Sequence, residues 1–420
     1  MMKLHMRALA AAGLLAGSLT TGASAADLGG NCCADLEERI AELEATAVRK
    51  GNRKVSLSIS GWVNQQVTWW DDGGENNLYV HDIGSTLGSH VKFTGGASFS
   101  PGWSAGYVLQ IEAMGSDGLT TDQGGFVDTD GDGVNDANGH HGPGALGGGF
   151  STPQVLQSYW FIKSDMLGKL SQASDNTAIL VDGSGSLISA NWVSFDINSF
   201  FVRNAATGAL TNRRWGEAGG CVWGDCNGVP LNAVRYDSPS FGGFSVSASW
   251  GEDDFWDVAA RYAGEIVGFR LAAAVAYSES TDLGVQGSNG IDRTDYIQAG
   301  VYLQHIGTGL FALGNYGNFD VDQAGAVASD TWYVKGGLRQ RFSSIGNTVL
   351  YGEWLTNSDG GNAGSDLDMW GLGAVQEIDA AAMSIWIKYR HASVEGLVDG
   401  GAVINADDYQ WVGAGALINF

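Results

Sequence analysis

The chain has little of several things that common protein classes need. Beyond its first residues it has no apolar run of 18 residues, which excludes a membrane-spanning helix there. Charged residues make up only 16% of the 420 residues, and 5 prolines stand beside 64 glycines and 15 tryptophans. That composition fits many strands with tight turns and aromatic belts better than a soluble α/β enzyme.

Motifs for catalysis are lacking too. No Ser-His-Asp or Cys-His order, phosphate-binding loop or zinc-ligand spacing stands out, and the glycine-rich residues 144–149 lack the strand-then-helix context that a phosphate-binding loop needs. We therefore predict that the protein is not an enzyme. A net charge of −24 also opposes binding to nucleic acid.

Residues 1–25 have the three parts of a secretory signal peptide. Lys3 and Arg7 supply the positive start, residues 8–16 the apolar centre, and Ala23-Ser24-Ala25 the cleavage site. The apolar centre is too short to span a bilayer. Cleavage removes two cations and no acid, so the net charge changes from −24 to −26. Export also places the 4 cysteines in an oxidising compartment, where they can pair.

The following residues, 26–53, carry a short helical pattern before the main domain. Their apolar residues are spaced 3, 4, 3 and 4 apart, which is a heptad seam. They are Cys33, Leu36, Ile40, Leu43 and Ala47. We expect a short periplasmic coiled-coil helix. Because two heptads are marginal alone, a frayed helix or flexible lead-in is the alternative.

From residue 54 onward the period of the pattern becomes two. The clearest case is the end of the chain, where every second residue from Val412 to Phe420 is apolar. A strand can end a protein with a bare apolar face when that face touches lipid. We therefore predict an all-β fold, a transmembrane antiparallel β-barrel in the outer-membrane lipid and lipopolysaccharide, with Phe420 as the signal to the barrel-assembly machinery.

About sixteen alternating segments can be counted over residues 54–420, which we predict to form one barrel domain. They lie near 54–68, 88–99, 103–114, 155–164, 168–174, 231–238, 243–251, 255–264, 267–279, 294–304, 309–318, 331–342, 346–355, 368–377, 383–391 and 408–420. Short glycine-containing turns, such as Ala263-Gly264-Glu265 and residues 306–309, alternate with longer insertions. The longest insertions, 115–153 and 175–230, are expected on the outer side of the membrane.

Four short motifs follow one another in an order typical of one family. They are Cys33-Ala34-Asp35-Leu36, Ser60-Gly61-Trp62-Val63, Val234-Arg235-Tyr236-Asp237-Ser238-Pro239 and the closing Gly415-Ala416-Leu417-Ile418-Asn419-Phe420. With these motifs the mature chain resembles the alphaproteobacterial (Rhizobiales-type) outer-membrane porin family. The resemblance implies a homotrimer of sixteen-stranded, water-filled barrels that pass small hydrophilic solutes and ions by passive diffusion.

The same resemblance implies two further features. Residues 175–230, after the fifth strand, would fold into the lumen as a constriction loop. Some relatives of this kind are tethered to peptidoglycan through a mature Ala-Asp start, which Ala26-Asp27 matches. The enlarged segment 115–153 departs from the family pattern, so solute preference does not carry over.

Basic residues fall on the polar side of several predicted strands. They are Arg235, Arg261, Arg270, Lys335, Arg339, Arg341, Lys388 and Arg390. A cation on the lipid face at mid-membrane would cost about 2–4 kcal/mol, so we expect these residues to line the lumen. The alternative is that some lie at the rims as solvated charges.

The expected constriction loop adds charges of both signs. They are Arg203, Arg213 and Arg214 beside Asp182, Asp196 and Glu217. Opposed charges across a narrow gap orient polar solutes and set ion preference. The negative net charge of the chain predicts a preference for cations, whereas the basic residues on the strands predict a preference for anions.

The four cysteines form two pairs of different character. Cys221 and Cys226 lie within the expected constriction loop, and we expect a disulfide that closes the loop tip, with metal ligands or reduced thiols as alternatives. Cys32 and Cys33 are adjacent and rarely pair with each other, so a link between subunits is one interpretation.

An acidic run in the insertion 115–153 has the spacing of a calcium loop. Asp128, Asp130, Asp132 and Asp136 would be the ligands, and Gly133 would permit the sharp turn between them. The flanking helices and distant glutamate of an EF-hand are missing, and an acidic loop without metal is the alternative. Calcium is the one cofactor that the sequence suggests.

These observations leave three functions to compare. The first is a passive diffusion channel. The second is a sugar-selective channel of the same fold, in which lumen tryptophans such as Trp386 form part of a sugar track. The third is an envelope-anchoring barrel tethered to peptidoglycan, in which the coiled coil matters more than the pore.

Overall fold

The computed structural model describes residues 55–82, 88–112, 122–123, 154–173, 197, 199–219, 232–251, 254–281, 293–323 and 325–420. Outside these ranges lie the predicted signal peptide (1–25), the coiled-coil lead-in (26–53), Asp182, Asp196, the calcium-like ligands Asp128, Asp130, Asp132 and Asp136, and the cysteine pair Cys221 and Cys226. Among the described residues no helix has the length and apolar character needed to cross a membrane.

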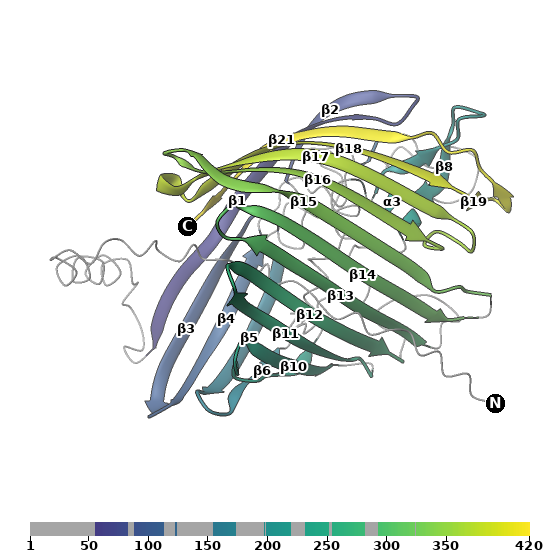
Figure 1. Cartoon of the computed structure of the whole chain (residues 1–420). Coiled ribbons are helices and arrows are strands. Elements are labelled where there is room, and N and C mark those ends of the chain that lie inside the picture. The colour runs from purple at the N-terminus through teal and green to yellow at the C-terminus, as the bar shows by residue number, and fades with distance from the viewer. Residues whose placement is uncertain are drawn as a thin grey trace.

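Most of the described strands form one antiparallel sheet of 17 strands that closes on itself (Figure 1). Its strands are β1 (Ser56–Asp71), β2 (Asn76–His81), β3 (His90–Ser100), β4 (Trp103–Glu112), β5 (Gln154–Ser164), β6 (Gly168–Ala173), β9 (Ala233–Asp237), β10 (Phe244–Gly251), β11 (Trp256–Ile266), β12 (Phe269–Ser280), β13 (Arg293–His305), β14 (Leu310–Asp322), β15 (Ser329–Ser343), β16 (Gly346–Ser358), β17 (Asp366–Ile378), β18 (Met383–Glu395) and β21 (Tyr409–Asn419). The last strand pairs with the first, so the sheet is a barrel.

The 17 strands of this sheet make sixteen crossings, because β2 and β3 are two halves of one crossing. Both pair with β1: Gln66 is opposite His81, and Trp62 is opposite His90. The pairing with β1 is interrupted by an insertion between His81 and His90. The Ser89 hydroxyl donates to the Asp82 carboxylate at 2.7 Å and holds the two ends of this insertion together. The predicted barrel of sixteen strands is confirmed, and the half-strand β2 was not expected.

The outer wall is apolar, as the period of two predicts. Val63 on β1 is opposite Ile418 on β21, and their exposed fractions are 54% and 45%. The alternate β1 residues Asn64, Gln66 and Thr68 are buried on the inner side. Apolar residues on one face and polar ones on the other are what a wall between lipid and water requires.

Closure is completed at the very end of the chain. The backbone N–H of Gly61 donates to the carbonyl of Phe420, and the N–H of Phe420 donates to the carbonyl of Gly61, both at 3.0 Å. The terminal residue is therefore the last rung of the ladder. Its ring is 58% exposed and contributes to the apolar outer wall.

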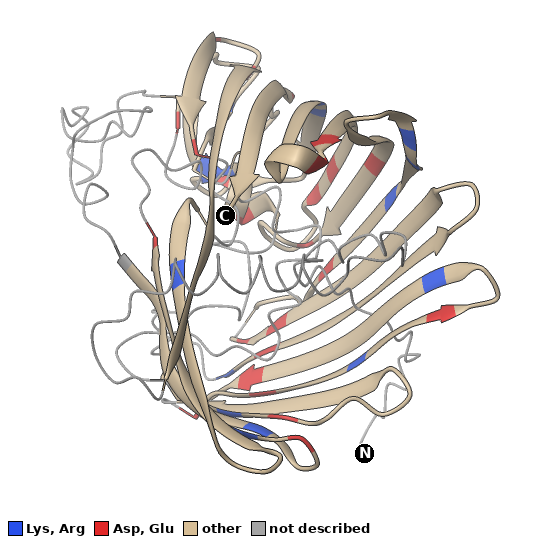
Figure 2. Ribbon diagram, turned by 90° about the vertical axis from the view of Figure 1, so that its left-hand side faces the viewer, with Lys and Arg blue, Asp and Glu red and all other residues tan. Residues whose placement is uncertain are grey.

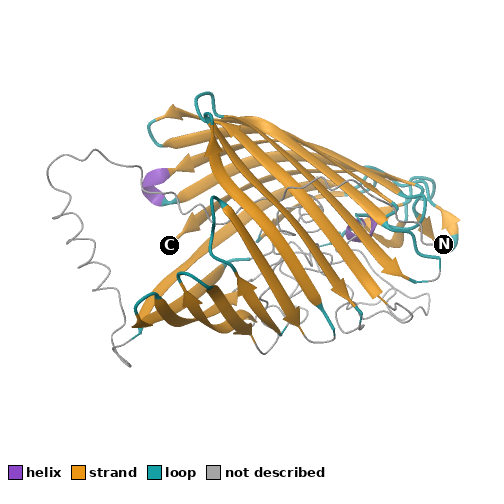
Figure 3. Ribbon diagram, turned by 60° about the horizontal axis from the view of Figure 1, so that its bottom comes forward, coloured by secondary structure: helices purple, strands orange, loops and turns teal. Residues whose placement is uncertain are grey.

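Short turns lie at one end of the barrel and longer connections at the other (Figure 3). The turn expected at Ala263-Gly264-Glu265 is wrong, since these residues continue β11 and the turn follows at Val267 and Gly268. Both turn residues have positive φ, 47° and 81°, as in a type I′ hairpin. Gly264 is part of the strand, opposite Leu271 of β12. A Cβ there would meet the Tyr262 hydroxyl at 2.6 Å, so the position favours glycine.

The remaining elements are short. A hairpin of β7 (Phe201–Arg203) and β8 (Leu210–Arg214) leads directly into α3 (Trp215–Ala218). A second small hairpin, β19 (Val398–Asp399) and β20 (Ala402–Val403), lies between β18 and β21. The 3-10 turn η2 (Asp379–Ala381) joins β17 to β18, at the opposite end of the barrel from α3 (Figure 3).

The two faces of β15 provide a test of this wall. Val334 is 47% exposed on the outer face, next to the inward Lys335. We predict that Val334→Arg lowers the free energy of unfolding by about 2–4 kcal/mol, because its charge would face lipid. Urea unfolding of the protein in lipid vesicles measures this. Val334→Leu is the control and should stay close to the wild type; equal stability of Val334→Arg would contradict the assignment of the face.

Candidate functional site

Acidic and basic residues are spread along the strands of the barrel (Figure 2). Several of them, such as Arg235, Glu353 and Arg390, lie at the inward positions of their strands. On one wall, the Asp237 carboxylate at the end of β9 accepts bonds from two cations. Arg235 lies 2.6 Å away on the same strand, and Lys169 of β6 lies 3.1 Å away. Ser247 of β10 also donates to Asp237, and Arg261 of β11 donates to Ser247 at 3.1 Å. The predicted basic residues Arg235 and Arg261 therefore meet in one network across four strands.

Acidic and basic side chains also meet on the part of the wall formed by β15 to β18. Glu353 of β16 has a fully buried side chain, and its carboxylate lies 2.7 Å from Nε of Arg390 and 3.4 Å from Nζ of Lys335. The Tyr333 hydroxyl donates to the same carboxylate at 2.6 Å. The Lys335 ammonium also lies over the Tyr351 ring, 3.9 Å from its centre. Lys388 is on the same side of β18 as Arg390.

Three of the predicted basic residues lie nearer the short turns. Arg339 pairs with Glu377 at 2.7 Å, Arg341 pairs with Asp379 at 2.7 Å, and Arg270 pairs with Glu265 at 3.0 Å. The side chains of Arg341 and Arg270 are 52% and 53% exposed, which suits solvated positions at the rim. Arg339 is 33% exposed.

The described part of the segment after the fifth crossing, residues 197 and 199–219, packs against the inner face. Ile197, Phe200, Val202 and Trp215 join a buried cluster with residues of the surrounding wall. The wall residues are Trp70, Tyr79, Tyr333, Leu355, Leu367, Met369, Ala392, Val394, Leu397, Tyr409 and Trp411. Aromatic rings dominate the contact: the Phe200 and Tyr409 centroids are 5.2 Å apart, and those of Phe200 and Trp70 are 5.3 Å apart.

A buried ion pair fixes this segment to the first hairpin. Arg203 donates to both carboxylate oxygens of Asp72, at 3.0 and 2.9 Å, and their side chains are 8% and 1% exposed. Its third nitrogen donates to the carbonyl of Gly208 at 2.7 Å. A bidentate pair in this surrounding is strong and directional. Arg203 is therefore held between Asp72 and its own segment and does not extend into the open lumen.

The other charged residues of the segment lie beside α3. Arg213 pairs with Glu217 at 3.4 Å and donates to the carbonyl of Gly361. The guanidinium of Arg214 lies 4.8 Å from the centre of the Phe201 ring. Arg213, Arg214 and Glu217 are thus neighbours around the start of α3. Asp182 and Asp196 are outside the described residues.

Trp386 is on the inner face but is already engaged. Its indole N–H donates to the side-chain oxygen of Gln66 on β1 at 3.0 Å, across β21. Gly415 of β21 makes room for the ring, since a Cβ there would lie 2.4 Å from it. The indole therefore braces the closing seam of the barrel.

Sequence reasoning missed the acidic partners. Glu353, Asp72 and Asp237 were not singled out, although Glu353 and Asp237 fall on the polar parity of predicted strands. An acid at that parity, with basic residues on neighbouring strands, is the signal that could have found them. Asp72 lies just past a strand end, where parity gives no information.

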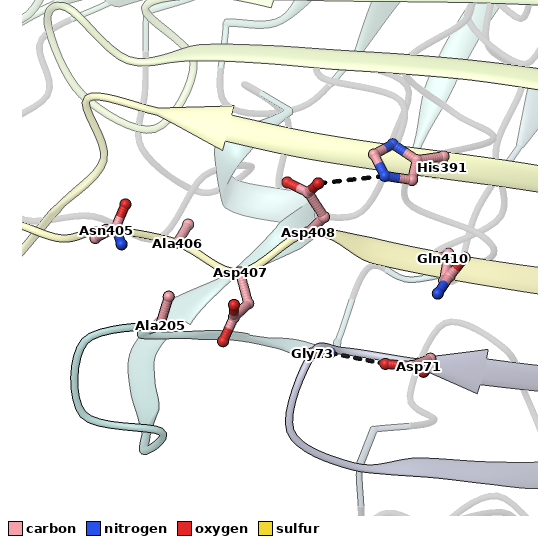
Figure 4. Close-up of a pocket in the computed structure, with 9 residues that line it drawn as sticks. All are labelled: Asp71, Gly73, Ala205, His391, Asn405, Ala406, Asp407, Asp408 and Gln410. Atoms are coloured by element: carbon pink, nitrogen blue, oxygen red, sulfur yellow. Dashed lines mark hydrogen bonds and ion pairs between the residues drawn. The ribbon is translucent and has the colours of Figure 1, made fainter.

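A separate pocket of about 460 Å³ lies at the outer end of β18, β21 and β1 (Figure 4). Its lining includes Asp71, His391, Asp408 and Gln410, which alternate with the inward residues of their strands. His391 contacts the Asp408 carboxylate at 3.3 Å. Within the described part of the chain, no group of three or more His, Cys, Asp or Glu residues is placed to hold a metal ion.

The fold is similar to that of several solved structures along nearly its whole length. An anion-selective porin from Comamonas acidovorans has a TM-score of 0.57 at 15% identity, with 87% of this chain and 100% of that chain covered. OmpT of Vibrio cholerae has a TM-score of 0.52 at 10% identity (89% and 100% covered). OmpF of Salmonella typhi, solved in complex with daunomycin, has a TM-score of 0.51 at 13% identity (88% and 99% covered). These likenesses define the class as porin-like barrels.

The chain itself belongs to the Gram-negative porin family, whose model matches residues 8–416. It is an outer-membrane porin channel of a Gram-negative bacterium. No curated protein matches the sequence.

The pair of Arg203 and Asp72 yields a prediction about the inner segment. We predict that Asp72→Asn costs about 3–5 kcal/mol, because it leaves a buried guanidinium without its counter-ion. Local opening of residues 199–219 should then rise at least about a hundredfold. Limited proteolysis of the detergent-purified protein, with cleavage sites mapped by mass spectrometry, measures this.

Glu75→Gln is the matched control, since Glu75 is 62% exposed and 3.8 Å from the same guanidinium. It should be cleaved like the wild type. If Asp72→Asn is no more sensitive than Glu75→Gln, the ion pair does not hold the segment.

Proposed function

We propose that the barrel is a passive diffusion channel for small hydrophilic solutes and ions, without catalysis. The observation that carries this proposal is the contrast between the two faces of each strand. The outer face is apolar, while the inner face carries networks such as Asp237 with Arg235 and Lys169. Charged groups inside a barrel hold water and interact with passing ions. No resident cofactor is needed for this activity.

The residues proposed to line the path are the basic residues of the inner face and the charges of the inner segment. They are Arg213, Arg214, Arg235, Arg261, Arg270, Lys335, Arg339, Arg341, Lys388, Arg390, Asp182, Asp196 and Glu217. Arg203 contributes by holding the inner segment in place through its ion pair with Asp72. The packing of residues 199–219 against the inner wall supports the view that residues 175–230 narrow the lumen.

The working assembly in this proposal is a homotrimer of the Rhizobiales-type subfamily. One porin-like structure of similar fold, OmpT of Vibrio cholerae, was solved in a trimer form; its TM-score is 0.50 at 11% identity, with 87% of this chain and 99% of that chain covered. Surface lipopolysaccharide, the barrel-assembly machinery, peptidoglycan at Ala26-Asp27 and a calcium ion at residues 128–136 complete the proposed partners. Cross-linking that yields single chains alone would contradict the trimer.

The sugar-selective alternative has less support. It relied on tryptophans such as Trp386 to present their rings and N–H groups to a sugar, and that N–H is donated to Gln66. A solute track would need this bond to break. Passive diffusion needs no such rearrangement.

Bilayer recording tests the proposal. We predict that the purified protein adds stepwise, ohmic current in a planar lipid bilayer, and that step size rises in proportion to the conductivity of the bulk salt, because the path is filled with water. Protein that inserts without conducting would refute the channel. Saturable block of the current by one sugar would instead favour the selective alternative.

A further inference from the structure

One level of the inner wall is organised around a single acid. Lys335, Glu353, Gly371 and Arg390 are direct neighbours on β15, β16, β17 and β18, since each is opposite the next in the strand register. All four share the inner face. The row holds two cations and one carboxylate, so its net charge is +1.

Gly371 permits the contact between Arg390 and Glu353, which are separated by the whole width of β17. A Cβ on Gly371 would lie 2.8 Å from the Glu353 carboxylate and 2.9 Å from Cγ of Arg390. Any larger residue would push the two side chains apart. The glycine is therefore part of the charge arrangement, because it lets one acid reach cations on both sides.

The three charges differ in their access to water. Glu353 and Arg390 have side chains 0% and 6% exposed, whereas Lys335 is 26% exposed. The acid thus compensates a buried guanidinium and leaves the ammonium of Lys335 as the accessible charge at this level. Buried charges are screened by salt much less than exposed ones, so their sum is felt in the lumen.

We propose that Glu353 is a specificity-determining residue of the channel. By compensating Arg390 it fixes the charge of this level at +1, and thereby sets how much this level contributes to the ratio of anion to cation permeability. This inference rests on the proposed diffusion function and names one residue that tunes it.

A series of variants tests the sum of charges rather than any one contact. Glu353→Gln raises the row to +2, and Lys335→Gln lowers it to 0. The double variant Glu353→Gln with Arg390→Gln keeps it at +1. The reversal potential across a potassium chloride gradient gives the ratio of chloride to potassium permeability for each.

We expect the ratio to rise at least about twofold in Glu353→Gln and to fall by a similar factor in Lys335→Gln, the size expected for one charge roughly 4–8 Å from a watery path. The double variant should match the wild type. The shifts should shrink between roughly 0.1 M and 1 M salt, because screening shortens from about 10 to about 3 Å.

Glu395→Gln is the matched control, since Glu395 is exposed on the outer face at the end of β18 and the change in total charge is the same. It should leave the ratio unchanged. Heat-modifiable migration of each variant on a gel verifies that the barrel is folded. If Glu353→Gln fails to fold, two results still test the proposal. The ratio of chloride to potassium permeability should fall in Lys335→Gln, and the double variant should keep the wild-type ratio.

Two results would overturn the inference: conducting Glu353→Gln channels with the wild-type ratio, or a double variant shifted as far as Glu353→Gln. Absence of current in the wild type is a different outcome. It would remove the proposed diffusion function itself.

Discussion

The barrel depends on pairing backbone groups where no water is available. In the hydrocarbon layer an open strand edge would leave each N–H and C=O without a partner, at a cost of several kcal/mol apiece. The pairing of β1 with β21 and the reciprocal bonds between Gly61 and Phe420 remove that edge. Once the sheet is closed, its two faces meet different media. The alternation along every strand follows from that closure.

Inside the barrel the governing interaction is compensation of charge between neighbouring strands. Glu353 forms ion pairs with Lys335 and Arg390, and Asp237 forms ion pairs with Lys169 and Arg235. Such clusters keep a net positive charge while holding long side chains against the wall. The same principle fixes the inner segment, where Arg203 meets Asp72 beside a cluster of aromatic rings. A channel with a defined lumen needs its charges held in this way, since mobile side chains would blur both width and field.

Much of the fold could be predicted, because strand existence and face follow from a local period of two. The alternation from Val412 to Phe420 identified the lipid face of the last strand, and all sixteen crossings were found. The errors were made where local signals mislead. The Ala-Gly pair at Ala263 and Gly264 suggested a turn, yet Gly264 pairs with Leu271 within β11 and β12, and glycine there leaves space for the Tyr262 side chain. The half-strand β2 was missed because pairing with β1 across an insertion is not a local property.

By itself the sequence determined that this chain is an exported barrel with basic residues on its inner parity, because alternation and signal-peptide composition are properties of neighbouring residues. Tertiary structure alone decided which charges meet. Glu353 and Arg390 are 37 residues apart, and their contact depends on strand register and on the glycine between them. Arg203 and Asp72 are 131 residues apart, and their contact depends on the segment that folds against the inner wall. Register depends on turn geometry and on the stagger that closes the whole barrel, so no single strand contains it.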